Sequence, residues 1–163
     1  MQNKAIFLDR DGVLINNSAD YYIWKKEQMH FVDGVFDHLK LFVQKGFQLF
    51  IVSNQGGISK GFYTKNDILK LHGELDLIFR KKEIEIKEIV FCPHHPEIKR
   101  CLCRKSQPLM IEKLIAKYQL SKEDSYLIGD SETDMEAARR AGIQGIKVTS
   151  NQNMVPFISF LIK

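Results

Sequence analysis

Short apolar segments alternate along the chain with segments of helical periodicity, and this alternation constrains the fold more than any other feature. The predicted strands are residues 4–9, 47–54, 86–92, 125–130 and 143–149. The predicted helices are residues 34–46, 64–82, 109–118 and 132–142. Such alternation is typical of an open parallel sheet with helices on both faces. We therefore predict an α/β fold built on a doubly wound parallel sheet.

Local signals mark the ends of several predicted helices. Thr64 is the expected N-cap of its helix, and Asp67 follows three residues later, as in a capping box. Gly46 and Gly142 are placed to end two helices. Pro108 is expected in the first turn of another.

The length and composition indicate one globular domain over residues 1–163. Hydrophobic residues make up 44% of the chain and charged residues 27%, which is ordinary for a soluble protein. No apolar run approaches the ~20 residues of a membrane helix, and the first residues do not resemble a signal peptide. We expect a cytoplasmic protein with reduced cysteines. The net charge of +4 is mild and forms no basic stripe, which argues against a nucleic-acid partner.

Polar residues follow the predicted strands at the places where ligands bind in parallel sheets, outside the carboxyl ends. The first strand ends in "DRDG", which brings Asp9 and Asp11 together, and the fourth ends at Asp130. Three converging carboxylates form a hard oxygen site suited to Mg²⁺. The alternative is that Asp9 and Asp11 only cap a turn.

The second strand ends in "SNQGG", with a hydroxyl at Ser53 and a glycine-containing turn whose backbone N–H groups could hold phosphate. The alternative is an ordinary tight turn. Lys105 could add a fixed positive charge. Together with the carboxylates, these groups are the parts that phosphoryl transfer through an aspartyl-phosphate requires.

The motifs "FLDRDG", "IVSNQGGI", "CRK" and "LIGDSETD", in this order, resemble those of the haloacid dehalogenase superfamily of phosphatases. The resemblance implies a Rossmann-like fold. It implies that Asp9 is the nucleophile and that Asp11 protonates the leaving oxygen and then activates water. It further implies that Ser53 holds the phosphoryl group and that Lys105 neutralises it.

The same resemblance implies the metal ligands. Asp130 would bind Mg²⁺ together with the side chain of Asp9 and the backbone of Asp11, and Asp134 would support that loop. The short spacings between the motifs leave no room for a cap domain. We therefore expect an open site.

Four residues in the stretch 92–103 have the types and spacing of a zinc site. Cys92, His94, Cys101 and Cys103 form two close pairs and suit a tetrahedral structural Zn²⁺. The alternatives are a redox pair or scattered core cysteines, and His95 is a competing imidazole. Cytosolic conditions and the Cys-x-Cys spacing disfavour a disulfide.

"CPHHP", "GGISKGFYT" and the C-x-C-R-K sequence narrow the resemblance to the D,D-heptose 1,7-bisphosphate phosphatases and the related histidinol-phosphate phosphatases. Both families share the zinc loop, which implies His94 as the ligand. Ser106 and Leu109 depart from the heptose pattern, where proline and glycine are usual. The candidate substrate contacts are Arg10, Tyr22, Asn54, Gln55 and Arg104.

The sequence therefore predicts a Mg²⁺-dependent phosphatase that acts, as a monomer, on a small phosphorylated metabolite, with heptose bisphosphate as the first candidate. The alternatives are a histidinol-phosphate phosphatase, a nucleic-acid 3′-end phosphatase and a binding protein without activity. The lack of a basic groove argues against the nucleic-acid enzyme.

Overall fold

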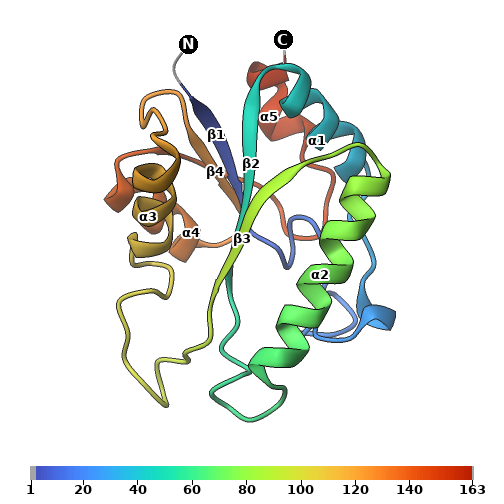
Figure 1. Ribbon diagram of the computed structural model, residues 1–163, viewed down its shortest axis with the longest axis vertical. Helices are drawn as coiled ribbons and strands as arrows, with labels where there is room; N and C mark the ends of the chain where they lie inside the picture. The colour runs from blue at the N-terminus through green and yellow to red at the C-terminus, as the bar shows by residue number, and fades with distance from the viewer. Residues whose placement is uncertain (1–2, 163) are drawn as a thin grey trace.

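The computed structural model describes residues 3–162, which form one parallel sheet with the strand order β3-β2-β1-β4-β5 (Figure 1). The strands are β1 Lys4–Leu8, β2 Phe47–Asn54, β3 Ile86–Cys92, β4 Tyr126–Gly129 and β5 Gln144–Lys147. The predicted strands and the doubly wound order are confirmed. β1 lies at the centre, with β2 and β4 as its parallel neighbours.

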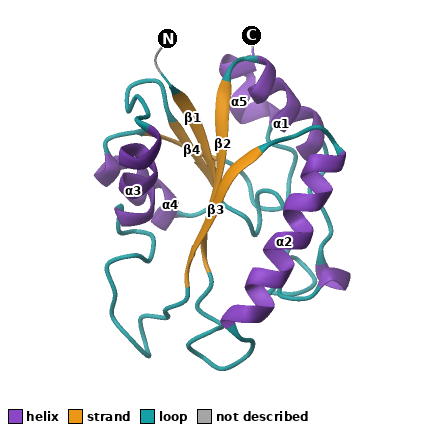
Figure 2. Cartoon of the chain, in the orientation of Figure 1, coloured by secondary structure: helices purple, strands orange, loops and turns teal. Residues whose placement is uncertain are grey.

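Helices cover both faces of the sheet, as predicted. They are α1 Val35–Gln44, α2 Lys65–Lys81, α3 Leu109–Tyr118, α4 Glu132–Ala141 and α5 Val155–Ile162, with a short 3₁₀ helix η1 Lys26–Gln28. Figure 2 shows α1, α2 and α5 on one side of the sheet and α3 and α4 on the other. No helix among residues 3–162 is long and apolar enough to span a membrane.

Alternate side chains of β1 enter two separate cores. Ile6 and Leu8 pack toward α1, α2 and α5, whereas Ala5 and Phe7 pack toward α3 and α4. All four are fully buried. A strand covered on both faces reads as a continuous apolar run, which is why the sequence predicts β1 so clearly.

The predicted helix ends are largely confirmed. Thr64 and Asp67 form a capping box, in which the Thr64 hydroxyl accepts from the Asp67 N–H and the Asp67 carboxylate accepts from the Thr64 N–H. Gly142 ends α4 in the left-handed region, with φ at 77°. Pro108 lies one residue before α3, as its N-cap, and not inside the first turn.

The arrangement of the strands brings distant segments together at one edge of the sheet. Leu8, near the end of β1, pairs with Ile51 of β2 and Ile128 of β4. The residues that follow these strands therefore meet at the carboxyl edge, while the start of β1 and the end of α5 lie near the opposite edge (Figure 1). In residues 3–162, the connection from β1 to β2 holds η1 and α1, and each later connection between strands holds one helix, without a separate unit over that edge.

Candidate active site

A cavity of about 270 Å³ lies at the carboxyl edge of the sheet. Its walls come from the segments that follow β1, β2, β3 and β4. Of the predicted catalytic, substrate and magnesium residues, those that line it are Asp9, Asp11, Tyr22, Ser53, Asn54, Gln55, Arg104, Lys105 and Asp130. Arg10 is the one predicted residue that does not.

Lys105 lies between two carboxylates at the bottom of the cavity. Its Nζ is 2.8 Å from Asp9 Oδ1 and 2.6 Å from Asp134 Oδ1, and it donates to the Val52 carbonyl at 2.7 Å. The side chain is almost completely buried. Asp130 completes the group, because one oxygen each of Asp9, Asp130 and Asp134 lies within 4.8 Å of the others.

In this group, the negative charges of the carboxylates outnumber the single positive charge of Lys105. Burial raises the pKa of Asp9 to about 8, and the neighbouring Asp134 and Asp130 add to the increase against the opposing effect of Lys105. Burial opposes the charge on Lys105, but Asp9 and Asp134 together raise its pKa. Burial likewise opposes the charge on Asp134, and Lys105 nevertheless lowers the pKa of that carboxyl.

Three carboxylates therefore share one ammonium group, which leaves a deficit of two positive charges if all are ionised. Hard oxygen donors in this number, with this deficit, fit one divalent cation such as Mg²⁺. A cation there would favour the ionised form of Asp9.

The carboxylate of Asp11 is balanced separately. Arg10 holds it through two parallel hydrogen bonds of 2.8 Å, from Nε to Oδ1 and from Nη2 to Oδ2. The Arg10 side chain is fully buried behind Asp11. The Asp11 carboxylate therefore occupies the guanidinium group of Arg10 in this structure, and a contact between Arg10 and the substrate stays a prediction.

Two amide side chains of the β2 loop organise the site from the other side. Asn54 makes two hydrogen bonds to the backbone of Lys105: its Oδ1 accepts from the Lys105 N–H at 3.0 Å, and its Nδ2 donates to the carbonyl at 2.8 Å. Gln55 donates to the Ser53 hydroxyl at 2.8 Å and to Asp11 Oδ2 at 3.2 Å. The Tyr63 hydroxyl donates to the side-chain oxygen Oε1 of Gln55 at 2.8 Å.

Gly12 allows the loop after β1 to approach the loop after β4. Its φ is 87°, and a Cβ atom at this position would lie 2.2 Å from Asp130 Oδ2 and 2.7 Å from Ser150 Oγ. Only glycine fits both constraints. The glycine of "DRDG" is thus part of the geometry that brings Asp130 to the site.

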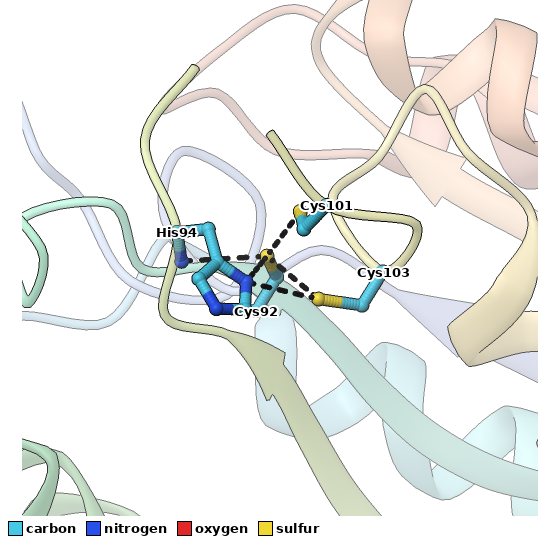
Figure 3. A group of neighbouring side chains, drawn as sticks. All are labelled: Cys92, His94, Cys101 and Cys103. Atoms are coloured by element: carbon cyan, nitrogen blue, oxygen red, sulfur yellow. Dashed lines mark hydrogen bonds between the residues drawn. The ribbon is translucent and has the colours of Figure 1, made fainter. Parts of the chain in front are cut away.

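Figure 3 shows the side chains of Cys92, His94, Cys101 and Cys103 pointing toward one another. Cys92 Sγ lies 3.1 Å from Cys103 Sγ and 3.6 Å from Cys101 Sγ, and His94 Nδ1 lies 3.3 Å from Cys103 Sγ. The predicted convergence of these four residues is confirmed. Three sulfurs and one imidazole nitrogen in this arrangement fit tetrahedral coordination of Zn²⁺.

His95, the competing imidazole, lies in the wall of the active-site cavity instead. The backbone N–H of His95 donates to Ser59 Oγ at 2.7 Å. The Cys/His cluster and the cavity are joined by a short link, because Arg104 and Lys105 follow Cys103 directly. Arg104 Nη1 donates to the His94 carbonyl at 3.0 Å.

The sequence did not assign roles to several residues around the cavity. Tyr63 and His72 lie behind the loops: the Tyr63 hydroxyl donates to the Gln55 side chain and its ring packs against Tyr22, whereas His72 contacts Arg10. Asn17, Ser131 and Thr133 line the cavity. Asn17 falls in no motif that marks it, whereas Ser131 and Thr133 fall inside "GDSETD", where their position alone could have indicated them.

The parallel sheet and the carboxylates at its edge define a hydrolase of the haloacid dehalogenase class. The family model described as HAD-hydrolase-like matches residues 102–156. The protein is also 38% identical over 143 residues to the D-glycero-α-D-manno-heptose-1,7-bisphosphate 7-phosphatase of Campylobacter jejuni, which covers 88% of this chain and 80% of that protein. It is 38% identical over 143 residues to the corresponding β-anomer enzyme of Helicobacter pylori, covering 87% of this chain and 81% of that one.

The chain belongs to this family, the D-glycero-D-manno-heptose-1,7-bisphosphate 7-phosphatases, and is a phosphoric monoester hydrolase. Its fold also resembles the crystal structure of a D,D-heptose 1,7-bisphosphate phosphatase from B. bronchiseptica complexed with magnesium and phosphate. The TM-score is 0.82 and the identity 23%, over 97% of this chain and 86% of that one.

Proposed function

We propose that the substrate of this protein is D-glycero-D-manno-heptose 1,7-bisphosphate and that the phosphate on C7 is removed. The relatives at 38% identity carry this activity in their names. The observation that carries the chemistry is the position of Asp9, partly buried beside Lys105 and two further carboxylates at the wall of an open cavity. The two relatives are named for opposite anomers, so both anomers are candidate substrates.

Each step has a residue of this chain to perform it. A carboxylate oxygen of Asp9 attacks phosphorus while the bond from phosphorus to the sugar oxygen breaks, and a protonated Asp11 gives its proton to that oxygen. Asp11 then takes a proton from water, whose oxygen attacks phosphorus. Phosphate leaves and the Asp9 carboxylate is restored. Ser53 and Lys105 bind the phosphoryl oxygens.

Mg²⁺ is the cofactor that fits the oxygen donors. The side chains of Asp9 and Asp130 and the backbone carbonyl of Asp11 would hold it. When bound, it offsets the negative charge of the phosphate and of the nucleophile. The charge deficit among these three carboxylates supports this assignment.

Zn²⁺ is the metal that fits the Cys/His cluster. The protein fills all four positions of the tetrahedron, so this zinc would be structural. It would fix the segment that carries Arg104 and Lys105 against the cavity. The zinc-free form would have to order that segment by packing alone.

The test compares kcat/KM on both anomers of the heptose bisphosphate, histidinol phosphate and a 3′-phosphorylated oligonucleotide, with Mg²⁺ present. We expect one heptose anomer to exceed the other two substrate classes by about a hundredfold or more. Phosphorus NMR of the product identifies which phosphate is lost. A preference for histidinol phosphate or for the oligonucleotide would contradict the proposed substrate.

The Asp9→Asn variant is the control for the mechanism. It keeps the shape of the side chain but removes the nucleophile, so we expect turnover at background level on every substrate. Retained turnover in this variant would rule out the aspartyl-phosphate route.

A further inference from the structure

The guanidinium group of Arg10 is fully enclosed by protein and makes four polar contacts. Nε and Nη2 hold the two oxygens of Asp11 at 2.8 Å each. Nη2 also donates to the Ile23 carbonyl at 2.6 Å. Nη1 lies 3.0 Å from His72 Nε2. The first three partners are acceptors on the β1 loop or the segment after it, whereas His72 belongs to α2.

The direction of the bond between Arg10 and His72 follows from their chemistry. A guanidinium group has donors and no acceptor, so Nη1 donates and His72 Nε2 accepts. The imidazole is then neutral, with its hydrogen on Nδ1. Burial, with the positive charge of Arg10, lowers the pKa of His72 to about 3, in agreement with this tautomer.

His72 is itself held rigidly. It is 5% exposed. Its ring contacts the edge of the Phe91 ring, with centroids 5.4 Å apart. It lies on the buried face of α2, next to Leu71 and Leu75 in the core. A rigid acceptor on a helix is well suited to fix the rotation of a buried guanidinium group.

Asp11 is thereby oriented by Arg10, which does not itself line the cavity, and by Gln55, which does. Arg10 fixes both of its oxygens from behind. Gln55, itself held by Tyr63, donates to Oδ2 from the β2 loop. The carboxylate remains at the cavity wall, where a leaving oxygen would need its proton.

We propose that His72 is a positioning residue for proton transfer, because it fixes Arg10 and, through Arg10, the orientation of the Asp11 carboxylate. This inference rests on the proposed function, in which Asp11 protonates the leaving oxygen. Without the His72 acceptor, the buried Nη1 loses a partner, and Arg10 must turn or admit water to replace it. The two hydrogen bonds from Arg10 to Asp11 then weaken, although no group that touches the substrate has changed.

The test uses the dependence on the leaving group. A sugar alkoxide needs a proton to leave, whereas a dinitrophenolate does not, so a misplaced general acid slows only the first reaction. We expect His72→Leu to lower kcat/KM for the heptose bisphosphate at least about tenfold more than for 2,4-dinitrophenyl phosphate. We expect His72→Gln, which keeps an acceptor oxygen, to restore most of this ratio. The ratio is independent of the fraction of folded enzyme.

His38→Leu is the matched control, because His38 is a second buried histidine on a helix of the same face, at 4% exposure. We expect it to change both rates by one common factor. Equal losses on both substrates in His72→Leu, with an active wild type, would overturn the positioning role and leave the proposed function standing. A wild type that hydrolyses neither substrate would instead overturn the proposed function itself.

Discussion

Lys105 connects two carboxylates that come after different strands, since Asp9 follows β1 and Asp134 lies in α4, after β4. Its own position depends on Asn54, which binds both backbone groups of Lys105 from the end of β2. The short motif "CRK" indicated the lysine but not this support. Replacing the lysine would therefore leave Asp9 and Asp134 facing each other without a shared counter-charge.

Gly12→Ala should damage the metal site more than the fold. The new Cβ would meet Asp130 Oδ2 at 2.2 Å, so that Asp130 must move. The positive φ adds about 1–2 kcal/mol of strain. We expect weaker Mg²⁺ binding in calorimetric titrations and a fall in kcat/KM of about tenfold or more.

Gly61→Ala separates these two effects. Its φ is 77°, but no atom lies within 4 Å of the new Cβ. We expect a similar loss of stability with nearly unchanged kcat/KM. If Gly12→Ala and Gly61→Ala lost equal activity, the cause would be backbone strain. The contact between the new Cβ and Asp130 would then not be the reason that Gly12 is needed.

At the scale of elements, the segment between β3 and α3 combines the Cys/His cluster and Lys105. Replacing Cys101 and Cys103 by serine should remove zinc, lower the melting temperature and reduce kcat/KM by about a hundredfold, because small displacements of a positioning group cost that much. Metal analysis of the purified protein and steady-state kinetics test this.

Lys99→Ala with Arg100→Ala is the control within the same loop, since both side chains are exposed. We expect normal zinc content and normal turnover. If the serine variant lost its zinc but kept full activity, the cluster would not be needed to place Lys105.

The elements nearest the site could be predicted because each carries its own local signal. A continuous apolar run marks β1 and β2, and Thr64 with Asp67 marks the start of α2. α5 was not predicted, because its sequence "VPFISFLI" is apolar apart from Ser159 and lacks the periodicity that distinguishes a surface helix. η1 is three residues long and too short to show a pattern.

On the scale of the whole molecule, the buried pair of Arg10 and His72 makes stability depend on pH. The pKa of His72 is about 3 in the folded protein and near 6.5 when exposed, so between these values only the unfolded chain binds the proton. Stability is therefore complete above pH 6.5 and decreases below it, by up to about 1.4 kcal/mol per pH unit.

The His72→Gln variant has no imidazole at this position, so its free energy of unfolding lacks the pH-dependent contribution of His72. Urea unfolding at pH 7.5 and 5.5 should show the wild type losing about 1.4 kcal/mol more than the variant. A parallel decrease in both proteins would show that His72 is protonated in the folded state.

The same pair shows where prediction from the sequence ends. The motifs placed Asp9, Asp11, Ser53, Lys105 and Asp130 at the cavity because strand ends are local and parallel strands align them. Arg10 and His72 are 62 residues apart, and no local pattern relates them. The direction of the Arg10 side chain depends on what the core leaves open behind Asp11, which only the packed molecule determines.

The end of α5 lies near the edge of the sheet where β1 begins (Figure 1). The cavity lies at the opposite edge. A fusion partner or a solid support attached at either end would be separated from the substrate entrance by the length of the strands. The enzyme can thus be anchored through its termini on a surface or a carrier with its entrance facing the solution. An attachment through the 94–101 loop would instead place the carrier beside that entrance.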